Sequence, residues 1–251
     1  MKAMTFKGKT VVITGAASGM GLLAAKELAL RYGAAVVMCD VNAGTLERLS
    51  CEIGGAGGKV FPCVGDVRRY ETAEHAAALA VERTGRIDML LAFAGGYGPR
   101  MCNSKVPFYR QPREVLDWGI DVNLKGPIYF ARTCMPVMVE SGGGVICCLG
   151  SVTGFEGDGD GAMYGTAKSG LFNFVKGIAQ CGAPHGVRAF CVTPGPVLTR
   201  PDMADIRTLL GRAAEPIEVV DYILYLCSEN AAFVTGSNHV IDGGRLAMQP
   251  Q

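Results

Sequence analysis

Short, continuous apolar runs recur along the 251-residue chain, and segments with helical periodicity lie between them. We count seven such runs, over residues 10–14, 34–40, 59–64, 87–95, 144–151, 187–195 and 237–244. Strands that are apolar throughout, rather than at every second residue, are typical of a parallel sheet that helices cover on both faces. The pattern therefore predicts an α/β fold with a doubly wound, seven-stranded parallel sheet.

The segments between the runs carry apolar residues at helical spacing, chiefly over residues 18–33, 43–54, 70–85 and 113–141. Several of these segments close on glycine, which is favoured just past the end of a helix. Pro136 falls inside the last segment, where we expect a kink. A chain of this length with 49% hydrophobic residues can bury one sizeable core, so we expect a single domain over residues 1–251.

The charge pattern excludes several classes of partner. The chain has 24 basic and 23 acidic residues, interspersed, so no basic face is expected to bind nucleic acid or an anionic membrane. The first apolar run ends at Gly15, too early for a signal peptide, and no run approaches the roughly 18 residues of a membrane span. We expect a cytoplasmic protein whose partners are small molecules.

The cysteines and histidines do not predict a metal site. Cys147 and Cys148 are adjacent in an expected strand, so their side chains point to opposite faces. His75, His185 and His239 lie far apart without ligand spacing, and we expect them on the surface or in loops. In a chain without an export signal, the ten cysteines are expected to be small, buried apolar residues rather than disulfide partners.

The sequence TGAASGMG places Gly15, Gly19 and Gly21 directly after the first expected strand and at the start of a helix. Glycine lets the backbone approach a pyrophosphate there, and the free N–H groups and the helix dipole stabilise the phosphate charge. A tight strand-to-helix turn is the simpler interpretation of the same glycines. The next strand, however, ends in Asp40, at the distance where a carboxylate accepts hydrogen bonds from the adenosine ribose.

The choice between the two nicotinamide dinucleotides also depends on this region. Ser18 and Val41 provide no arginine for a 2′-phosphate, and Asp40 would repel one, so we expect NAD. Asp66 follows the third expected strand, where it either caps the next segment or contacts adenine.

Tyr164 and Lys168 are four residues apart in an expected helix, so they share one face. A free tyrosine side chain has a pKa of about 10, and ionisation near neutral pH requires roughly 4 kcal/mol of preference for the phenolate. An adjacent ammonium in a site shielded from water can supply that preference. Such a phenol can take a proton from an alcohol, or return it to a ketone. The simpler interpretation is an exposed helix face.

With the motifs NLKG (123–126), Ser151, PGPVLT (194–199) and TGSNHVIDGG (235–244), these features resemble the short-chain dehydrogenase/reductase family from residue 6 to about 246. The motifs occur in the family's order and spacing. The resemblance implies a Rossmann fold, a nicotinamide cofactor, interconversion of alcohols and ketones, and a homotetramer or homodimer.

The resemblance implies four catalytic residues. Tyr164 is the general acid/base, and Lys168 assists it and donates to the nicotinamide ribose. Ser151 hydrogen-bonds the reacting oxygen, and Asn123 holds a water that links Lys168 to solvent.

The motifs and the resemblance also give a set of expected cofactor contacts: Gly15, Ser18, Gly19, Met20, Gly21, Asp40, Val41, Asp66, Val67, Ala94, Gly95, Tyr164, Lys168, Pro194, Gly195, Val197 and Thr199. Pro194 and Gly195 are expected to turn the chain so that Val197 and Thr199 hold the carboxamide. The chain departs from the family at one place. Ala92 and Phe93 replace the usual Asn-Asn before Ala94 and Gly95, so an altered cofactor geometry is expected there.

The resemblance also implies that three loops form the substrate pocket, over residues 95–113, 152–163 and 196–216. The first is longer than the family usually has and the last is shorter, so the first should take over part of the last loop's role as a lid. Glu156, Asp158 and Asp160 lie close to Ser151 in sequence, and carboxylates accept hydrogen bonds from several hydroxyl groups. They predict a polar cyclic or sugar-like alcohol, unless they form only a solvated turn.

Three alternatives remain open. The enzyme could be a hydroxysteroid dehydrogenase or a 3-oxoacyl-thioester reductase. The chain could also be a nucleotide-binding regulator without catalytic activity.

Overall fold

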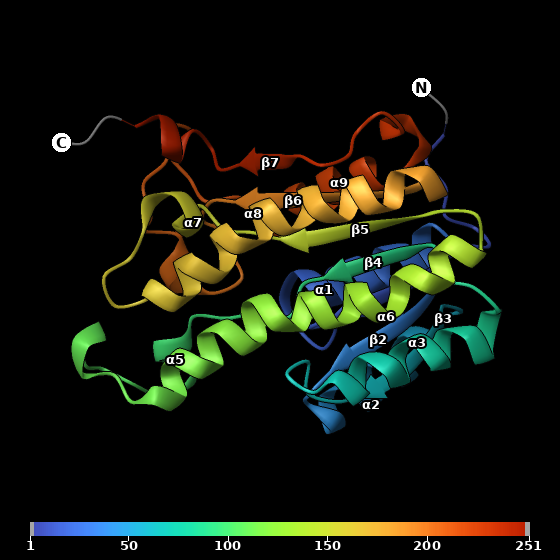
Figure 1. Ribbon diagram of the computed structural model, residues 1–251, viewed down its shortest axis with the longest axis horizontal. Helices are drawn as coiled ribbons and strands as arrows, with labels where there is room; N and C mark the ends of the chain where they lie inside the picture. The colour runs from blue at the N-terminus through green and yellow to red at the C-terminus, as the bar shows by residue number, and fades with distance from the viewer. Residues whose placement is uncertain (1–2, 249–251) are drawn as a thin grey trace.

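The computed structural model describes residues 3–248 and contains a seven-stranded sheet (Figure 1). All seven predicted runs form strands, in the spatial order β3-β2-β1-β4-β5-β6-β7, and every neighbouring pair is parallel. The predicted fold class is therefore confirmed. The strands are β1 (Thr10–Thr14), β2 (Ala35–Asp40), β3 (Lys59–Val64), β4 (Met89–Ala92), β5 (Gly144–Leu149), β6 (Val187–Pro194) and β7 (Asn238–Ile241). Residues 1–2 and 249–251 of the expected domain lie outside the described residues.

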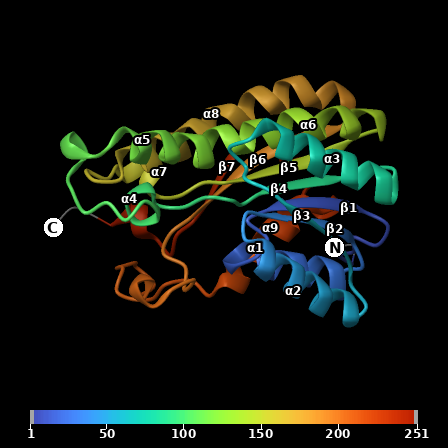
Figure 2. The same ribbon diagram turned by 90° about the horizontal axis from the view of Figure 1, so that it is seen from below.

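Helices cover both faces of the sheet (Figure 2). The α-helices are α1 (Gly19–Lys26), α2 (Ala43–Gly55), α3 (Tyr70–Thr84), α4 (Gly98–Met101), α5 (Arg113–Ile120), α6 (Gly126–Glu140), α7 (Thr153–Glu156), α8 (Ala162–Gly182) and α9 (Pro216–Cys227). The first of them continues through a π-helical turn, Glu27–Arg31. Short 3-10 turns lie at Phe108–Arg110, Ala183–His185, Pro201–Met203, Glu229–Ala231 and Arg245–Ala247.

Two apolar cores lie on the two faces of the sheet. The strands β1 and β4 are buried along their whole length, which explains why their sequences are apolar at every position. Cys147 belongs to one core and Cys148 to the other, as the strand alternation predicts. Of the three histidines, His239 departs from the expectation of a surface or loop position, because it lies half-buried in β7.

The segment expected as one helix over residues 113–141 is helical but not uniform. It consists of α5, a five-residue π-helical segment over Asp121–Lys125, and α6. Single π-turns inside helices occur frequently at functional sites. The π-helical segment contains Asn123, one of the predicted site residues. The helix α6 continues past Pro136 and ends at Glu140.

The order of the strands reverses between β1 and β4, so the connections after these two strands leave in opposite directions. In open parallel sheets, ligands bind beyond the carboxyl ends of the strands at such a switch point. The three expected substrate loops also start at this edge, after β4, β5 and β6. Across residues 3–248, no helix has both the length and the apolarity that crossing a bilayer would require.

Candidate active site

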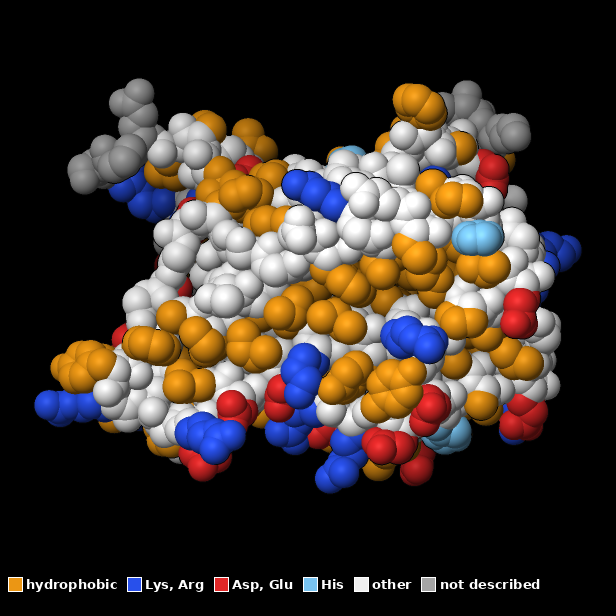
Figure 3. Space-filling view, viewed as in Figure 1, with side chains coloured by type: hydrophobic (Ala, Val, Ile, Leu, Met, Phe, Trp, Pro, Cys, Tyr) orange, Lys and Arg blue, Asp and Glu red, His pale blue; other side chains and the backbone are white. Residues whose placement is uncertain are grey.

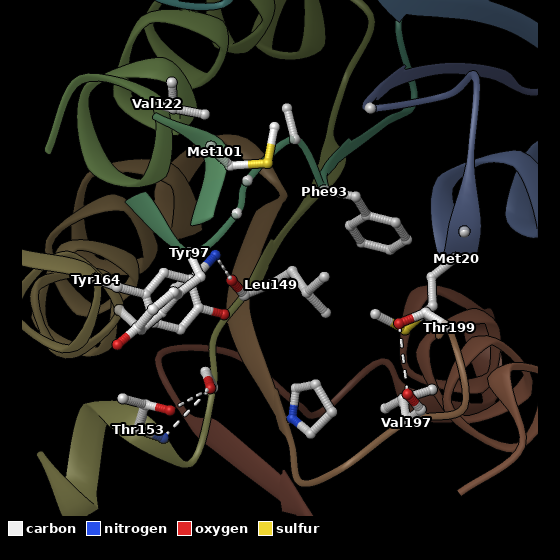
Figure 4. A pocket seen from close by; sticks show the side chains of 18 of the residues that line it. Met20, Phe93, Tyr97, Met101, Val122, Leu149, Thr153, Tyr164, Val197 and Thr199 are labelled. Atoms are coloured by element: carbon white, nitrogen blue, oxygen red, sulfur yellow. Dashed lines mark hydrogen bonds between the residues drawn. The ribbon is translucent and has the colours of Figure 1, made fainter. Parts of the chain in front are cut away.

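A groove of about 1080 Å³ lies at the carboxyl edge of the sheet (Figure 4). Pockets for a single small ligand are usually about 300–1,000 Å³, so this groove lies just above that range. Every residue that the sequence predicts for the cofactor lines this groove, and so do Ser151, Tyr164 and Lys168. Of the predicted catalytic and cofactor residues only Asn123 does not line it, and of the three carboxylates expected at the substrate Asp160 does not.

The glycine turn after β1 has the close backbone approach that the sequence predicts. Gly15 has a φ of 71°, a conformation that favours glycine. A Cβ atom on Gly21 would lie 2.2 Å from the carbonyl oxygen of Gly15, so a larger residue would force the helix away from the turn. The N-terminus of α1 therefore opens directly into the groove, with its free N–H groups available to an anion.

The Asp40 carboxylate is held in place by the backbone around it. It accepts hydrogen bonds from the amide of Ala17, in the glycine turn, at 3.0 Å and from the amide of Asn42 at 3.0 Å. Val41 is 70% exposed beside it. Asp40 thus braces the glycine turn and remains half-buried at the wall of the groove.

Asp66 caps the turn that follows β3. Its carboxylate accepts a hydrogen bond from the Arg68 amide at 2.9 Å and forms an ion pair with the Arg68 side chain at 2.6 Å. These hydrogen bonds from Arg68 lower the pKa of Asp66. The first of the two expected roles, the cap, is therefore observed. Arg68 also lines the groove, and sequence analysis missed it because it lies outside the positions where a phosphate-binding arginine was sought.

Tyr164 and Lys168 both lie on α8 and face the end of β5. The Lys168 ammonium is 5.5 Å from the centroid of the Tyr164 ring and donates to the Leu149 carbonyl at 2.7 Å. Lys168 is only 3% exposed, so its charge is largely shielded from solvent. Ser151 follows β5, and its hydroxyl donates to the Thr153 hydroxyl at 3.2 Å while it accepts from the Thr153 amide at 3.2 Å.

Asn123 lies behind the groove wall and is fully buried. Its side-chain oxygen accepts from the Gly96 amide at 2.9 Å, and its side-chain nitrogen donates to the carbonyls of Gly96 at 2.9 Å and Gly119 at 3.0 Å. A Cβ atom on Gly95 would lie 2.7 Å from the Asn123 oxygen and 3.2 Å from the Lys168 nitrogen. Asn123 thus fastens the loop after β4 to α5, next to Lys168.

At Ala92 and Phe93, where the sequence departs from the family pattern, the end of β4 is held to β1 by hydrogen bonds and presents an apolar ring to the groove. The Thr14 hydroxyl accepts hydrogen bonds from the amides of Phe93 and Ala94, both at 3.0 Å, and so joins β1 to the end of β4. The Phe93 ring is 7% exposed and lies in the groove across from Met20 (Figure 4). An apolar surface therefore replaces the expected amides at this place.

The substrate loops are joined to one another by side chains that the sequence analysis did not connect. The Tyr97 hydroxyl donates to Asp158 at 3.1 Å, and the Gln111 side-chain amide donates to the Asp160 carbonyl at 2.7 Å. On the other side of the pocket, Arg245 forms an ion pair with Glu156 at 2.7 Å. Two of the three carboxylates expected to receive substrate hydroxyls thus already accept hydrogen bonds from the protein.

Comparisons with known proteins agree with this geometry. Residues 9–208 match the family described as short chain dehydrogenase. The chain is 32% identical to an L-rhamnose 1-dehydrogenase (NAD(P)(+)) of Sphingomonas sp., over 95% of this chain and 96% of that protein. It is 33% identical to the 3-oxoacyl-[acyl-carrier-protein] reductase of Thermotoga maritima, over 96% and 99%.

Among solved structures, a 7α-hydroxysteroid dehydrogenase in complex with NADH and 7-oxo glycochenodeoxycholic acid superimposes with a TM-score of 0.87. The two chains are 27% identical, over 96% of this chain and 95% of the other. Family match, sequence relatives and structural likeness agree. The chain therefore belongs to the short-chain dehydrogenase family, whose members are oxidoreductases acting on CH–OH groups.

Proposed function

We propose that the protein is an NAD(H)-dependent oxidoreductase that interconverts a secondary alcohol and a ketone, with Tyr164 as general acid/base. The observation that carries the proposal is the meeting of Ser151, Tyr164 and Lys168 in the same groove as the glycine turn and Asp40. Nucleotide binding alone would not require the first three, which argues against a regulator without activity.

The residues of the groove fit a nicotinamide dinucleotide. Glycines occupy the positions where a Cβ atom would meet backbone, at Gly15 and Gly21, so phosphates can approach the N-terminus of α1. Asp40 would accept hydrogen bonds from the ribose, and Val197 and Thr199 would hold the carboxamide. Neither Ser18 nor Val41 is basic, which supports NAD over NADP.

When bound, the nicotinamide would accept or donate the hydride. The protein's own residues would handle the proton. Tyr164 would take the proton from the alcohol, and Lys168, held against the Leu149 carbonyl and close to the ring, would stabilise the phenolate. Ser151 would turn its hydroxyl from Thr153 towards the reacting oxygen as charge develops there. Asn123 would hold the water of a proton relay from a position behind Lys168.

Both polar and apolar side chains of the groove bear on the substrate class. The carboxylates of Glu156 and Asp158 lie at the groove, as a sugar or polyol would require, but their hydrogen bonds with Arg245 and Tyr97 would have to be shared. The groove is also lined by the apolar side chains of Met101 and Trp118, beside Gly96, which a hydroxysteroid would cover. The names of the relatives give a sugar, a steroid and an acyl-thioester as their substrates. Because the groove has both polar and apolar walls, we propose a cyclic secondary alcohol with one polar and one apolar face.

The test is a panel of sugars, polyols, hydroxysteroids and 3-oxoacyl thioesters, each assayed with NAD(H) and with NADP(H). The rate of cofactor reduction or oxidation is measured by the absorbance of the reduced cofactor. We expect turnover of cyclic alcohols with NAD. Tight binding of NADH without turnover of any compound would favour the regulator instead.

We also propose that the protein forms a homodimer or homotetramer. Partly buried apolar side chains, among them Met135, Val139, Phe174 and Ile178, emerge along α6 and α8, and Figure 3 shows apolar side chains gathered on that face. Sedimentation equilibrium should give a mass of two or four chains, and a monomer at micromolar concentration would contradict this.

A further inference from the structure

Tyr97, in the long loop after β4, lies beside the proposed catalytic tyrosine (Figure 4). The ring centroids of Tyr97 and Tyr164 are 6.0 Å apart and the rings cross at 68°, an edge-to-face arrangement. The Tyr97 hydroxyl donates to an oxygen of Asp158 at 3.1 Å. Burial, together with the charge of Asp158, raises the pKa of Tyr97 to about 12. Tyr97 therefore stays protonated over the working range of most enzymes and remains a hydrogen-bond donor.

The second loop is shaped to receive this ring. A Cβ atom on Gly161 would lie 2.2 Å from a carbon of the Tyr97 ring, although the φ of Gly161, −98°, would allow any residue. Position 161 must therefore be glycine because of the Tyr97 ring, and not because of its own backbone conformation. The Asp158 oxygen that receives the Tyr97 hydroxyl also accepts from the amides of Asp160 at 3.0 Å and Gly161 at 2.8 Å, so it is fixed in position.

A second contact joins the same two loops. Gln111, at the far end of the long loop, donates to the Asp160 carbonyl at 2.7 Å. The long loop is thus joined to residues 158–161 from both of its ends, and it closes one side of the pocket over Tyr164.

We propose that Tyr97 is a positioning and specificity-determining residue: its bond to Asp158 holds the loops 95–113 and 152–163 together, and its ring forms the wall against which the substrate's ring packs. This inference rests on the proposed function of the same groove. Because Tyr97 keeps its proton, it acts through position and shape, while Tyr164 transfers the proton. Loosening the contact should weaken substrate binding and admit bulkier alcohols, with little change in the chemical step.

The first test needs no substrate. Amide hydrogen exchange over residues 157–163 is measured in the parent protein, Tyr97→Phe and Gly161→Ala. Tyr97→Phe removes only the hydroxyl, and Gly161→Ala displaces the ring without altering Tyr97 or Asp158. We expect both variants to exchange at least fivefold faster there. The matched controls are Tyr225→Phe, at a half-exposed tyrosine on α9, and Gly54→Ala, at an exposed glycine on α2, and both should exchange at the parental rate. Parental exchange in both test variants would overturn the joining of the loops.

The second test uses an alcohol that the parent oxidises. We expect Tyr97→Phe and Gly161→Ala to raise KM at least fivefold, to leave kcat within about threefold, and to leave the Kd for NADH unchanged. Faster exchange with an unchanged KM and an unchanged ranking of substrates would refute the specificity role. If no alcohol were turned over by the parent, the proposed function would fail, and the exchange measurement would still decide whether Tyr97 joins the loops.

Discussion

The substitution Gly95→Ala tests the packing between Asn123 and Lys168. Gly95 does not have a positive φ, so the backbone itself accepts alanine. The added methyl group would lie 2.7 Å from the Asn123 oxygen and 3.2 Å from the Lys168 nitrogen, closer than atoms that are not bonded normally approach. Asn123 is fully buried and held by three hydrogen bonds to Gly96 and Gly119, so it cannot move without losing at least one of them.

The size of the effect follows from those hydrogen bonds. A buried polar group left without its partner costs about 1–3 kcal/mol. We therefore expect Gly95→Ala to lower the free energy of unfolding by about 2 kcal/mol, which is roughly 4–8 °C in Tm for a domain of this size. If Lys168 is displaced from the Leu149 carbonyl by the same methyl, kcat/KM should fall at least about tenfold, since about 1.4 kcal/mol corresponds to a factor of ten.

The assay is NADH absorbance with an alcohol that the parent oxidises, together with a calorimetric melt. Gly54→Ala is the matched control, because a methyl group there meets no atom within 4 Å and Gly54 is exposed on α2, outside the face proposed for assembly. That variant should keep parental activity and gain up to about 1 kcal/mol of stability from its better helix propensity. A Gly95→Ala protein with parental kcat/KM and parental Tm would refute the packing argument.

Two further predictions follow from carboxylates in the structure. The protein should bind NADH more tightly than NADPH, and Asp40→Ala combined with Val41→Arg should narrow or reverse that preference; tighter NADPH binding by the parent in calorimetric titration would count against it. Burial raises the pKa of Asp88, but hydrogen bonds from Arg86, a backbone amide and Lys9 outweigh it, and the net pKa is lowered. Its stabilisation is therefore present above the unfolded pKa of about 4 and is lost as the pH falls through the folded value. Asp88→Asn should lower stability by about 2 kcal/mol at pH 7, and the difference should shrink below about pH 4; a pH-independent difference in urea unfolding would contradict this.

The fold and the cofactor groove are predictable because they depend on local patterns. Seven continuous apolar runs indicate buried parallel strands, and all seven form them. The glycine spacing after β1 and the four-residue spacing of Tyr164 and Lys168 are properties of one turn and one helix. Neither spacing depends on where distant parts of the chain lie, so both can be identified from the sequence alone, and the structure brings these residues to one groove.

The contacts that close the substrate pocket are not predictable in this way. Tyr97 and Asp158 are 61 residues apart, and Arg245 and Glu156 are 89 apart. No periodicity links such pairs, so the carboxylates could be expected only as free acceptors, and the structure shows two of them engaged. The π-helical segment around Asn123 also lacks a sequence signal, because the hydrogen bonds of Asn123 join it to Gly96 in the loop after β4, 27 residues away in the chain.

The central claim is that the Tyr164 hydroxyl transfers the proton, and the substitution Tyr164→Phe tests it most directly. The variant deletes that oxygen and keeps the ring over Lys168, while the glycine turn and Asp40 are untouched. Turnover and the Kd for NADH are measured on the same preparation, with Tyr225→Phe as the matched control at a half-exposed tyrosine on α9. The account predicts that Tyr164→Phe binds NADH as the parent does and loses turnover. A variant that keeps more than a few per cent of the parental rate would show that another group moves the proton.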